Sequence, residues 1–385
     1  MKTLFFSLLG VSILMLVVYD VYATILHARA RSGPVAETLN RIVWRIARAL
    51  AFRLSRQRRH RLLNSIGPIL LPLLIIVFIV LLTLGFALVY YPRMPASFNV
   101  ALEAQSAPWI ESLYFSGITL TTVGYGDITP HSTEMRLTAM FESASGLALI
   151  SLAVTYLITV YAALERKRAG AISFYHQAEE GADVAAFIDH HFVEGAFHGL
   201  QATLRVAARD IQELLESHVE HPVIHYFHPV EVYKSMPRML FLVLELGVVI
   251  HSCLDGEEYR GLRERPEVRT LAASSRHVLQ ELINSLDLER RFKRRVETSR
   301  EESGRREQRF RQTMQRLGKA GIKTAPDRHA AWDEYRSRRD EWETQLHRFS
   351  SYLGYEWEEV TGDADLRYAA DEEMEEPREG RGQKL

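Results

Sequence analysis

The residues best suited to chemistry in this sequence form one short run with two glycines, Thr122-Val123-Gly124-Tyr125-Gly126. Gly124 and Gly126 adopt positive φ angles without steric cost, so the backbone of the run can alternate between right- and left-handed conformations. Such alternation points successive carbonyl oxygens to the same side, where they can replace the water around a dehydrating cation. Val123 and Tyr125 then turn their side chains outward into protein. The run therefore predicts an ion-coordinating loop.

Helices that can hold this loop in a membrane lie on both sides of it. The stretches at 68–91 and 137–164 are each long enough for the roughly 20 residues that cross a bilayer core. Pro108 suits the first position of a helix, and the segment that it opens is too short to cross. A helix that stops inside the membrane needs protein or water around it, so this segment is predicted to be re-entrant. The predicted pore domain at 67–168 comprises an outer helix at 67–91, a pore helix at 108–121, the loop at 122–126 and an inner helix at 133–165.

The run Thr121–Asp127 resembles the selectivity filter of potassium channels. Five specified residues in a row arise by chance on the order of once in millions of positions, and here they stand in the expected context. The resemblance implies an all-α membrane protein whose pore module assembles as a tetramer. It also implies that carbonyl groups replace the hydration shell of the permeant K⁺, with no other cofactor. The K⁺ ligands that it implies are the carbonyl oxygens of Thr122, Val123, Gly124 and Tyr125, with the Thr122 hydroxyl closing the innermost site.

The same resemblance assigns roles to residues beside the filter. Asp127 is expected at the outer mouth, where a carboxylate attracts cations and anchors the filter by hydrogen bonding. Tyr114 and Phe115 on the pore helix are expected to pack with Tyr125 and to support the width of the filter. Ile118 stands where some bacterial channels carry an acid paired with the outer aspartate. Inactivation that depends on such a pair is therefore in doubt for this chain.

Two residues of the inner helix stand out. Gly146 matches the family's gating hinge by its distance from the filter, and close helix packing is the alternative role for a small residue there. Glu142 lies one turn earlier, and a carboxylate within a membrane is functional by default. Its side chain either faces the inner cavity or packs behind the filter, and the sequence leaves both positions open.

One loop per chain cannot encircle an ion. The family solution is fourfold symmetry around the pore, so the chain is expected to form a homotetramer, or a heterotetramer with a close relative. The expected partners are thus further copies of the chain and the lipid bilayer.

An N-terminal transmembrane helix is predicted at 1–27, and its rival is a signal peptide cleaved near Ala23. Many arginines and one acid, Glu37, follow between residues 29 and 61, and residues 165–168 are also basic. A retained helix with its N-terminus outside puts both basic clusters inside, as the positive-inside rule requires. The expected location is the cell (inner) membrane, with several crossings and a cytoplasmic C-terminus.

The basic linker at 28–66 is predicted to contain an amphipathic helix. Arg41, Arg45 and Arg48 follow helical spacing with apolar residues between them, which suits a helix lying at anionic lipid headgroups. A voltage-sensing helix is the alternative. A voltage-sensing helix is disfavoured because Arg53 does not continue the helical spacing of the other arginines. In addition, only one membrane helix precedes this segment.

Residues 169–361 are predicted to form a helical cytoplasmic domain, followed by a disordered tail at 362–385. The apolar run at 239–250 is short and interrupted by Glu245, so a core helix is favoured over a fourth crossing. No Gly-rich turn or strand pattern of a nucleotide-binding domain follows Arg168. Cys253 is the single cysteine, which excludes an intrachain disulfide and a cysteine-based zinc site. The balance of 47 basic against 48 acidic residues does not favour nucleic acid as a partner.

Histidines are dense in the early cytoplasmic half. Metal binding or proton sensing is one hypothesis for them. A turn packed by imidazoles and aromatic rings is favoured, because Pro222 and Pro229 break the helix that would align ligands. The residues concerned are His190, His191, His198, His218, His221, His225 and His228.

The sequence therefore predicts a potassium-selective channel that conducts passively and is gated by an unidentified cytoplasmic signal. A weakly selective cation channel is the alternative within the same class. A membrane-anchored sensor or scaffold with a vestigial pore is the alternative from another class. No nucleophile–base pair, phosphate loop or metal cluster supports an enzyme.

Overall fold

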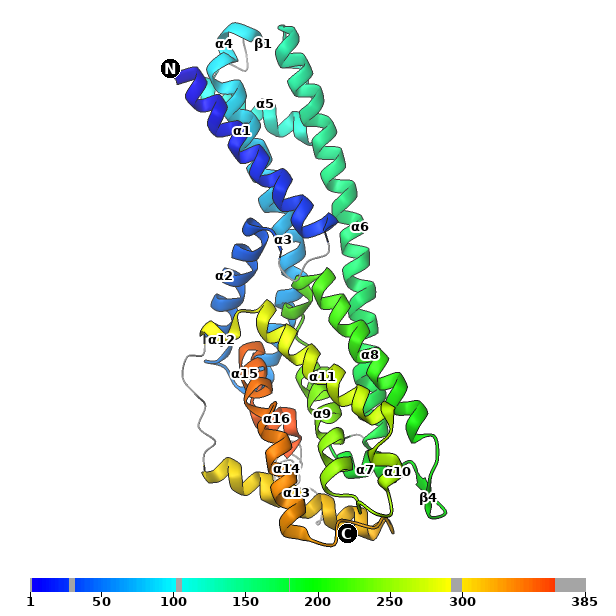
Figure 1. The fold of residues 1–385 in the computed structure, drawn as a ribbon. Helices are drawn as coiled ribbons and strands as arrows, with labels where there is room; N and C mark the ends of the chain where they lie inside the picture. Colours follow the sequence, from blue (N-terminus) through cyan, green and yellow to red (C-terminus); the bar gives the residue numbers. More distant parts are fainter. Residues whose placement is uncertain (1, 28–31, 102–105, 180, 292–299, 364–385) are drawn as a thin grey trace, which may run out of the picture. The chain divides into compact units, whose positions relative to one another are not determined.

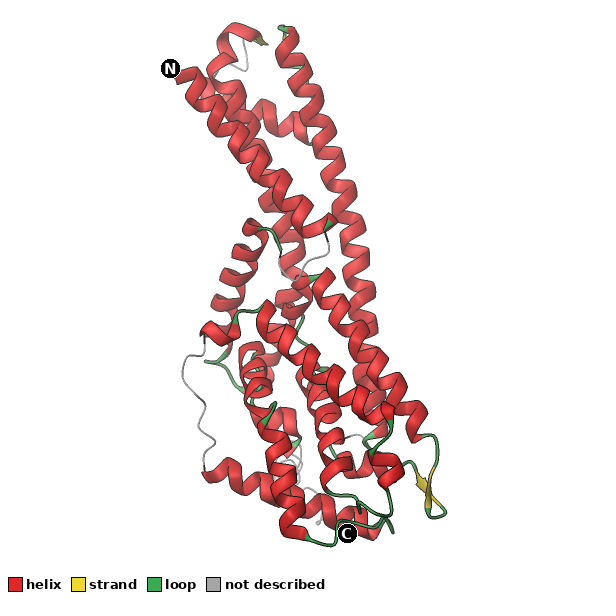
Figure 2. Ribbon diagram, viewed as in Figure 1, coloured by secondary structure: helices red, strands yellow, loops and turns green. Residues whose placement is uncertain are grey.

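The computed structural model describes residues 2–27, 32–101, 106–179, 181–291 and 300–363. These residues are mostly helical, with two short two-stranded antiparallel sheets (Figure 2). The chain divides into two compact units. The first unit comprises Met1–Arg53, Asn64–Leu164 and His218–Phe227, and the second comprises Leu54–Leu63, Glu165–Ser217 and His228–Leu385.

Three helices in the described part of the chain are long and apolar enough to cross a membrane. They are α1 (Lys2–Val21), α3 (Arg56–Tyr90) and α6 (Thr133–Gln177), the expected N-terminal, outer and inner helices (Figure 1). The sequence predicted the outer helix from 67 and the inner helix to 165. Both helices are longer, because their charged flanks contain good helix formers such as arginine, leucine and glutamate. Each helix therefore has residues in both units.

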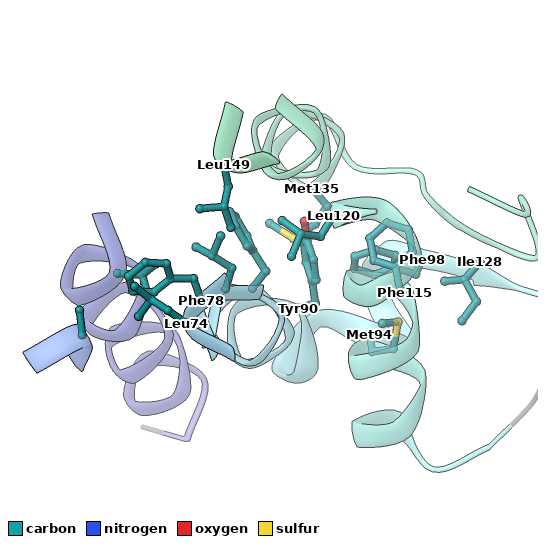
Figure 3. Close-up of a cluster of buried hydrophobic side chains, with 14 residues drawn as sticks. Leu74, Phe78, Tyr90, Met94, Phe98, Phe115, Leu120, Ile128, Met135 and Leu149 are labelled. Carbon is teal, nitrogen blue, oxygen red and sulfur yellow. The ribbon is translucent and has the colours of Figure 1, made fainter. Parts of the chain in front are cut away.

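An apolar stripe along α3 builds the core of the first unit. Phe78, Leu82, Phe86 and Tyr90 recur every four residues, which places them on one face of the helix. Phe115 packs edge-on against Tyr90 and against Phe98, with ring centroids 5.1 Å apart in both pairs. Figure 3 shows these side chains together with Leu120 and with Met135 and Leu149 of α6. The cluster holds the pore helix α5 (Pro108–Leu120) against the outer and inner helices.

A short β-ladder joins the two ends of the pore loop region. Strand β1 (Phe98–Val100) pairs antiparallel with β2 (Ile128–Pro130), and Asn99 lies opposite Thr129. Between Tyr90 and β1 the chain makes the short turns η2 (Tyr91–Arg93) and α4 (Met94–Ser97). The ladder fixes the chain just after the predicted filter to the chain that leaves the outer helix.

The link between α1 and the amphipathic helix is held by Asp20. Helix α1 continues into the π-helical turn η1 (Tyr22–Leu26), and α2 (Pro34–Ala51) follows. The buried Asp20 carboxylate accepts hydrogen bonds from the amides of Val35 at 2.5 Å and Ala36 at 3.2 Å. These amides belong to the first turn of α2, where helix N–H groups lack intrahelical partners. The acid in the first apolar stretch is therefore a helix anchor.

Helix α2 is amphipathic, as the spacing of its residues predicts. Trp44 is buried on one face and its ring lies 5.5 Å from that of Tyr226, in the short turn η4 (Pro222–Tyr226) of the same unit. Another face exposes Ile42, Ile46 and Leu50.

The second unit is a helical domain built around α9 (Met236–Ser252), whose residues are almost all buried. The apolar run at 239–250 is thus a core helix in the structure. Glu245 on α9 accepts hydrogen bonds from Tyr335 and from Arg339, at 3.3 Å in the second case. Around α9 lie α7 (Val184–Asp189), the hairpin of β3 (Phe192–Val193) and β4 (Ala196–Phe197), most of α8 (Leu200–Glu220), η5 (Val232–Lys234), α10 (Arg260–Arg263), α11 (Pro266–Ser285), α12 (Leu288–Arg291), α13 (Arg300–Lys319), α14 (Arg328–Asp340), α15 (Glu343–Leu353) and α16 (Trp357–Thr361).

The histidines between positions 190 and 228 are divided between the two units. His218 and His225 pack together in the first unit, with ring centroids 4.8 Å apart. His228 lies in the second unit and meets His60, which the sequence did not single out. Among the described residues, no group of three or more histidine, cysteine or acidic side chains is arranged to hold a metal ion. The tail expected at 362–385 lies almost wholly outside the described residues.

Candidate functional site

The pore helix α5 begins and ends at defined residues. Pro108 occupies its first turn, and the Glu111 side chain accepts a hydrogen bond from the backbone amide of Ser106 at 2.8 Å. Its 13 residues span about 20 Å at 1.5 Å per residue, less than a bilayer core. The helix ends at Leu120, immediately before the glycine-rich run. The expected half-helix is therefore present and leads straight into the loop.

The loop after α5 has an alternating backbone. Thr122, Gly124 and Gly126 have φ angles of +60°, +53° and +83°. The sequence predicted left-handed residues at the two glycines only, and the structure adds Thr122. A residue with a side chain is uncommon in this region, and strain of this kind gathers at functional sites. The alternation is the backbone geometry that turns successive carbonyl oxygens to one side.

Hydrogen bonds from the pore helix hold the start of the loop. The carbonyl oxygen of Ile118 accepts from the amides of Val123 at 2.8 Å and Gly124 at 3.2 Å. These amides are thus satisfied within the chain, which leaves the carbonyl groups of the loop for another partner. Ile118 therefore stabilises the loop through its backbone carbonyl group.

Asp127 is anchored by the pore helix. Its side chain accepts a hydrogen bond from the Tyr114 hydroxyl at 2.8 Å. The Asp127 carbonyl accepts from the Ala101 amide at 2.9 Å, next to the β-ladder. A tyrosine on the pore helix thus holds the outer aspartate. The resemblance had indicated an acid–acid pair for some relatives, and this chain uses a phenol from a different position.

The aromatic residues near the filter point in two directions within one chain. Phe115 is buried and packs against Tyr90 and Phe98 (Figure 3). Tyr125 is 73 % exposed and Val123 is 51 % exposed. The two outward side chains of the filter therefore have most of their surface free for contacts outside the single chain.

Glu142 packs behind the pore helix, which is one of the two positions that the sequence left open. The carboxyl group is fully buried and meets the hydroxyl of Tyr90 at 2.7 Å and that of Ser116 at 2.5 Å. The Ser116 hydroxyl also lies 3.0 Å from the carbonyl oxygen of Thr83. One acid therefore links α3, α5 and α6. Ser116 and Tyr90 were missed by sequence reasoning, because an ordinary serine and tyrosine carry no signal without their neighbours.

Gly146 lies where α6 crosses the end of the pore helix. A Cβ atom at this position would collide with the carbonyl oxygen of Leu120 and would approach its Cδ1 atom to 3.2 Å. The glycine thus permits a close approach of two helices, which is the packing role weighed for it. Helix α6 continues unbroken through this position from Thr133 to Gln177. The hinge role stays a prediction.

Fold and site together define an all-α membrane protein with a pore loop between two membrane helices. Residues 74–163, which contain the C-terminal part of α3, the pore helix, the loop and most of α6, match the ion channel family. Within this segment the chain is therefore similar to ion channels.

Two curated relatives share parts of the chain. The chain is 29% identical over 217 residues to "Uncharacterized membrane protein YdjJ" of Bacillus subtilis (strain 168), a match that covers 56% of this chain and 61% of that protein. It is 35% identical over 81 residues to "Two-pore potassium channel 2" of Arabidopsis thaliana, covering 21% of this chain and 17% of that one. The chain thus spans about three fifths of the first relative and under a fifth of the second. No solved structure matches it.

Gly146→Ala should destabilise the packing of α6 on the pore helix. The added methyl group meets a backbone carbonyl that cannot rotate away, and overpacking of this kind costs about 1–3 kcal/mol. Thermal unfolding of the lipid-embedded protein measures the change. Gly170→Ala on the same helix is the matched control, because its Cβ would come no closer than 3.8 Å to a neighbour. It should be neutral or stabilising by about 1 kcal/mol. Equal changes in thermal stability for Gly146→Ala and Gly170→Ala would contradict the close approach of α6 to the end of the pore helix.

Tyr114→Phe should loosen the outer end of the filter. The variant removes the hydroxyl that donates to Asp127 and leaves the ring in place. Hydrogen exchange of the backbone amides from 122 to 128 should become about fivefold faster, the ratio for a hydrogen bond worth about 1 kcal/mol. Tyr19→Phe removes an exposed hydroxyl on α1 and should leave these rates unchanged. Unaltered exchange in Tyr114→Phe would show that the contact does not hold the loop.

Proposed function

We propose that this protein is a potassium-selective channel that conducts K⁺ passively across the membrane. The alternation of left-handed residues at 122, 124 and 126, within a segment of the ion channel family, carries the proposal. The K⁺ ligands are the carbonyl oxygens of Thr122, Val123, Gly124 and Tyr125, and the Thr122 hydroxyl closes the innermost site. Carbonyl groups turned to one side supply the oxygen shell that a dehydrating ion loses. Asp127 at the outer mouth attracts cations toward them.

A homotetramer completes the pore. One chain supplies one loop, so symmetry-related copies must close the ring around the ion. The exposure of Val123 and Tyr125 supports this assembly, as do the exposed apolar residues Leu147, Val154 and Ile158 on α6. Apolar surface of this extent is covered by lipid or by other copies. Native mass spectrometry of the protein in lipid nanodiscs should give the mass of four chains, and a monomer would overturn the assembly.

Helix α2 lies at the cytoplasmic surface of the cell (inner) membrane in this proposal. Ile42, Ile46 and Leu50 enter the headgroup boundary, and Arg45 meets anionic lipids. The N-terminus is then outside and the second unit is cytoplasmic, as the positive-inside rule requires.

Arg45→Gln should reduce the number of anionic lipids that stay bound to the protein, because each basic residue at the surface contributes about 1 kcal/mol. Native mass spectrometry in mixed-lipid nanodiscs measures this number. Arg209→Gln, which changes an arginine of the second unit that pairs with Asp210, should have no effect. Equal lipid retention in wild type and Arg45→Gln would exclude the headgroup contact.

Potassium flux out of liposomes tests the main proposal. With an outward-directed gradient of each ion in turn, K⁺ should pass and Na⁺ should pass at least about tenfold more slowly, a difference of about 1.4 kcal/mol. Gly124→Ala should reduce this preference by about tenfold, since an alanine at positive φ costs about 1–2 kcal/mol. Gly261→Ala, where a Cβ meets nothing within 4 Å, is the control. Equal K⁺ and Na⁺ flux in wild type would favour the weakly selective channel. An absence of flux would favour the scaffold.

A further inference from the structure

Two buried histidines meet in the second unit. His60 lies near the start of α3, and His228 lies in the loop before η5. Their rings are within 13° of parallel, and Nδ1 of His60 is 2.7 Å from Nε2 of His228. Tyr355 stacks on His228 with ring centroids 4.2 Å apart. The geometry places one hydrogen atom between two facing ring nitrogens.

Three contacts engage the four ring nitrogens. Nε2 of His60 lies 2.9 Å from the Glu359 carboxylate, and Nδ1 of His228 lies 3.1 Å from the Leu353 carbonyl oxygen. Both oxygens can only accept, so each of these contacts requires a proton on the imidazole. The contact between the rings requires one proton more. Three contacts therefore need three protons, whereas two neutral imidazoles carry two.

The surroundings decide where the third proton rests. Burial raises the pKa of Glu359, but hydrogen bonds from His60, from the Glu356 amide and from Arg56 outweigh it and lower the pKa to about 2. The carboxylate is therefore ionised beside His60. Burial, with repulsion from His60 as the second cause, lowers the pKa of His228 well below 6.5. The third proton accordingly rests on His60, and His228 stays neutral.

We propose that His60 and His228 form a three-proton site that locks the first turns of α3 into the cytoplasmic domain and releases them when a fourth proton binds. With four protons, two N–H groups would face each other across 2.7 Å, and the pair would carry two positive charges. The rings must then separate. With only two protons on the pair, one of the three contacts would bring two hydrogen-bond acceptors together with no proton between them.

The charges around the site add to the effect of a fourth proton. Arg56 and Arg59 on α3 and Lys167 on α6 are positive, whereas Glu356 and Glu359 are the facing acids. Arg56 donates to Glu359 at 2.5 Å and Arg59 to Glu356 at 2.7 Å, so both carboxylates are already shared with arginines. A second imidazolium therefore gains little from them. Lowering the pH therefore weakens the contacts that hold the first turns of α3 in the second unit.

Protons can reach the site through a cavity of about 390 Å³ in the same unit. His60 and Arg56 form part of its wall, and the other charged residues along it are Glu231 and Arg238. A folded state in which His228 has a lowered pKa binds fewer protons than the unfolded state. The contribution of His228 to stability is therefore complete above pH 6.5 and is lost as the pH falls below it. Glu359 adds to this loss only at lower pH, from about 4.5 toward 2.

Helix α3 connects the histidine site to the helices around the proposed filter. It is one continuous helix from Arg56 to Tyr90, and Tyr90 is the residue that bonds Glu142 behind the pore helix. Release of its first turns therefore acts on the helix that supports the filter. This regulatory step rests on the proposed channel function, whereas the proton count does not.

Nitrogen NMR of histidine-labelled protein in lipid at pH 6.5 tests the proton count. Difference spectra against His60→Gln and His228→Gln should show His60 with both nitrogens protonated and His228 protonated at Nδ1 only. Two neutral rings, or a charged His228, would overturn the three-proton site. This readout needs no ion flux, so it decides the proton count even if the channel proposal fails.

Flux in liposomes tests the regulation. Wild-type K⁺ flux should be constant near pH 7 and change as the cytoplasmic side falls below pH 6.5, by up to about tenfold per pH unit for one proton. His228→Gln should remove this dependence and keep the flux at pH 7, because the amide accepts from His60 and donates to Leu353 without titrating. His329→Gln, an exposed histidine, should behave as wild type. A flat wild-type profile between pH 7 and 5, or an unchanged profile in His228→Gln, would overturn the regulation.

Discussion

The structure depends on one constraint, which is that peptide groups inside a bilayer must find partners. The pore helix is too short to cross a bilayer core, and the loop after it has left-handed residues at 122, 124 and 126. Such backbone persists only where protein or water surrounds it. Within the chain, Ile118 satisfies two amides of the loop and Tyr114 anchors Asp127. The amides of Val123 and Gly124 are thereby used within the chain.

The buried acid on the inner helix follows from the same constraint. Glu142 has no water to solvate it and is instead met by Tyr90 and Ser116. An intramembrane carboxyl group is costly unless it is hydrogen-bonded. Through these hydrogen bonds Glu142 on α6 is linked to α3 and to the pore helix α5. Gly146 completes the junction, since its lack of a side chain lets α6 approach the end of the pore helix.

Helices α3 and α6 both continue beyond their apolar stretches. Residues 54–63 and the chain from Glu165 onward belong to the second unit, so α3 and α6 each have a segment there. Helices α3 and α6 are therefore the two long helices that contribute residues to both units. The histidine pair connects α3, through His60, to the loop before η5, through His228, within the second unit.

The sequence by itself determined the local features. Apolar length predicted the three membrane helices, Pro108 the start of the pore helix, and two glycines most of the alternating loop, because these depend on neighbouring residues alone. Tertiary structure decided the contacts between distant positions. It placed Glu142 behind the pore helix, made Asp20 the cap of α2, turned Thr122 left-handed, and brought His60 to His228 across 168 positions. Side chains that are unremarkable in sequence acquire these roles only when a partner far along the chain is packed against them.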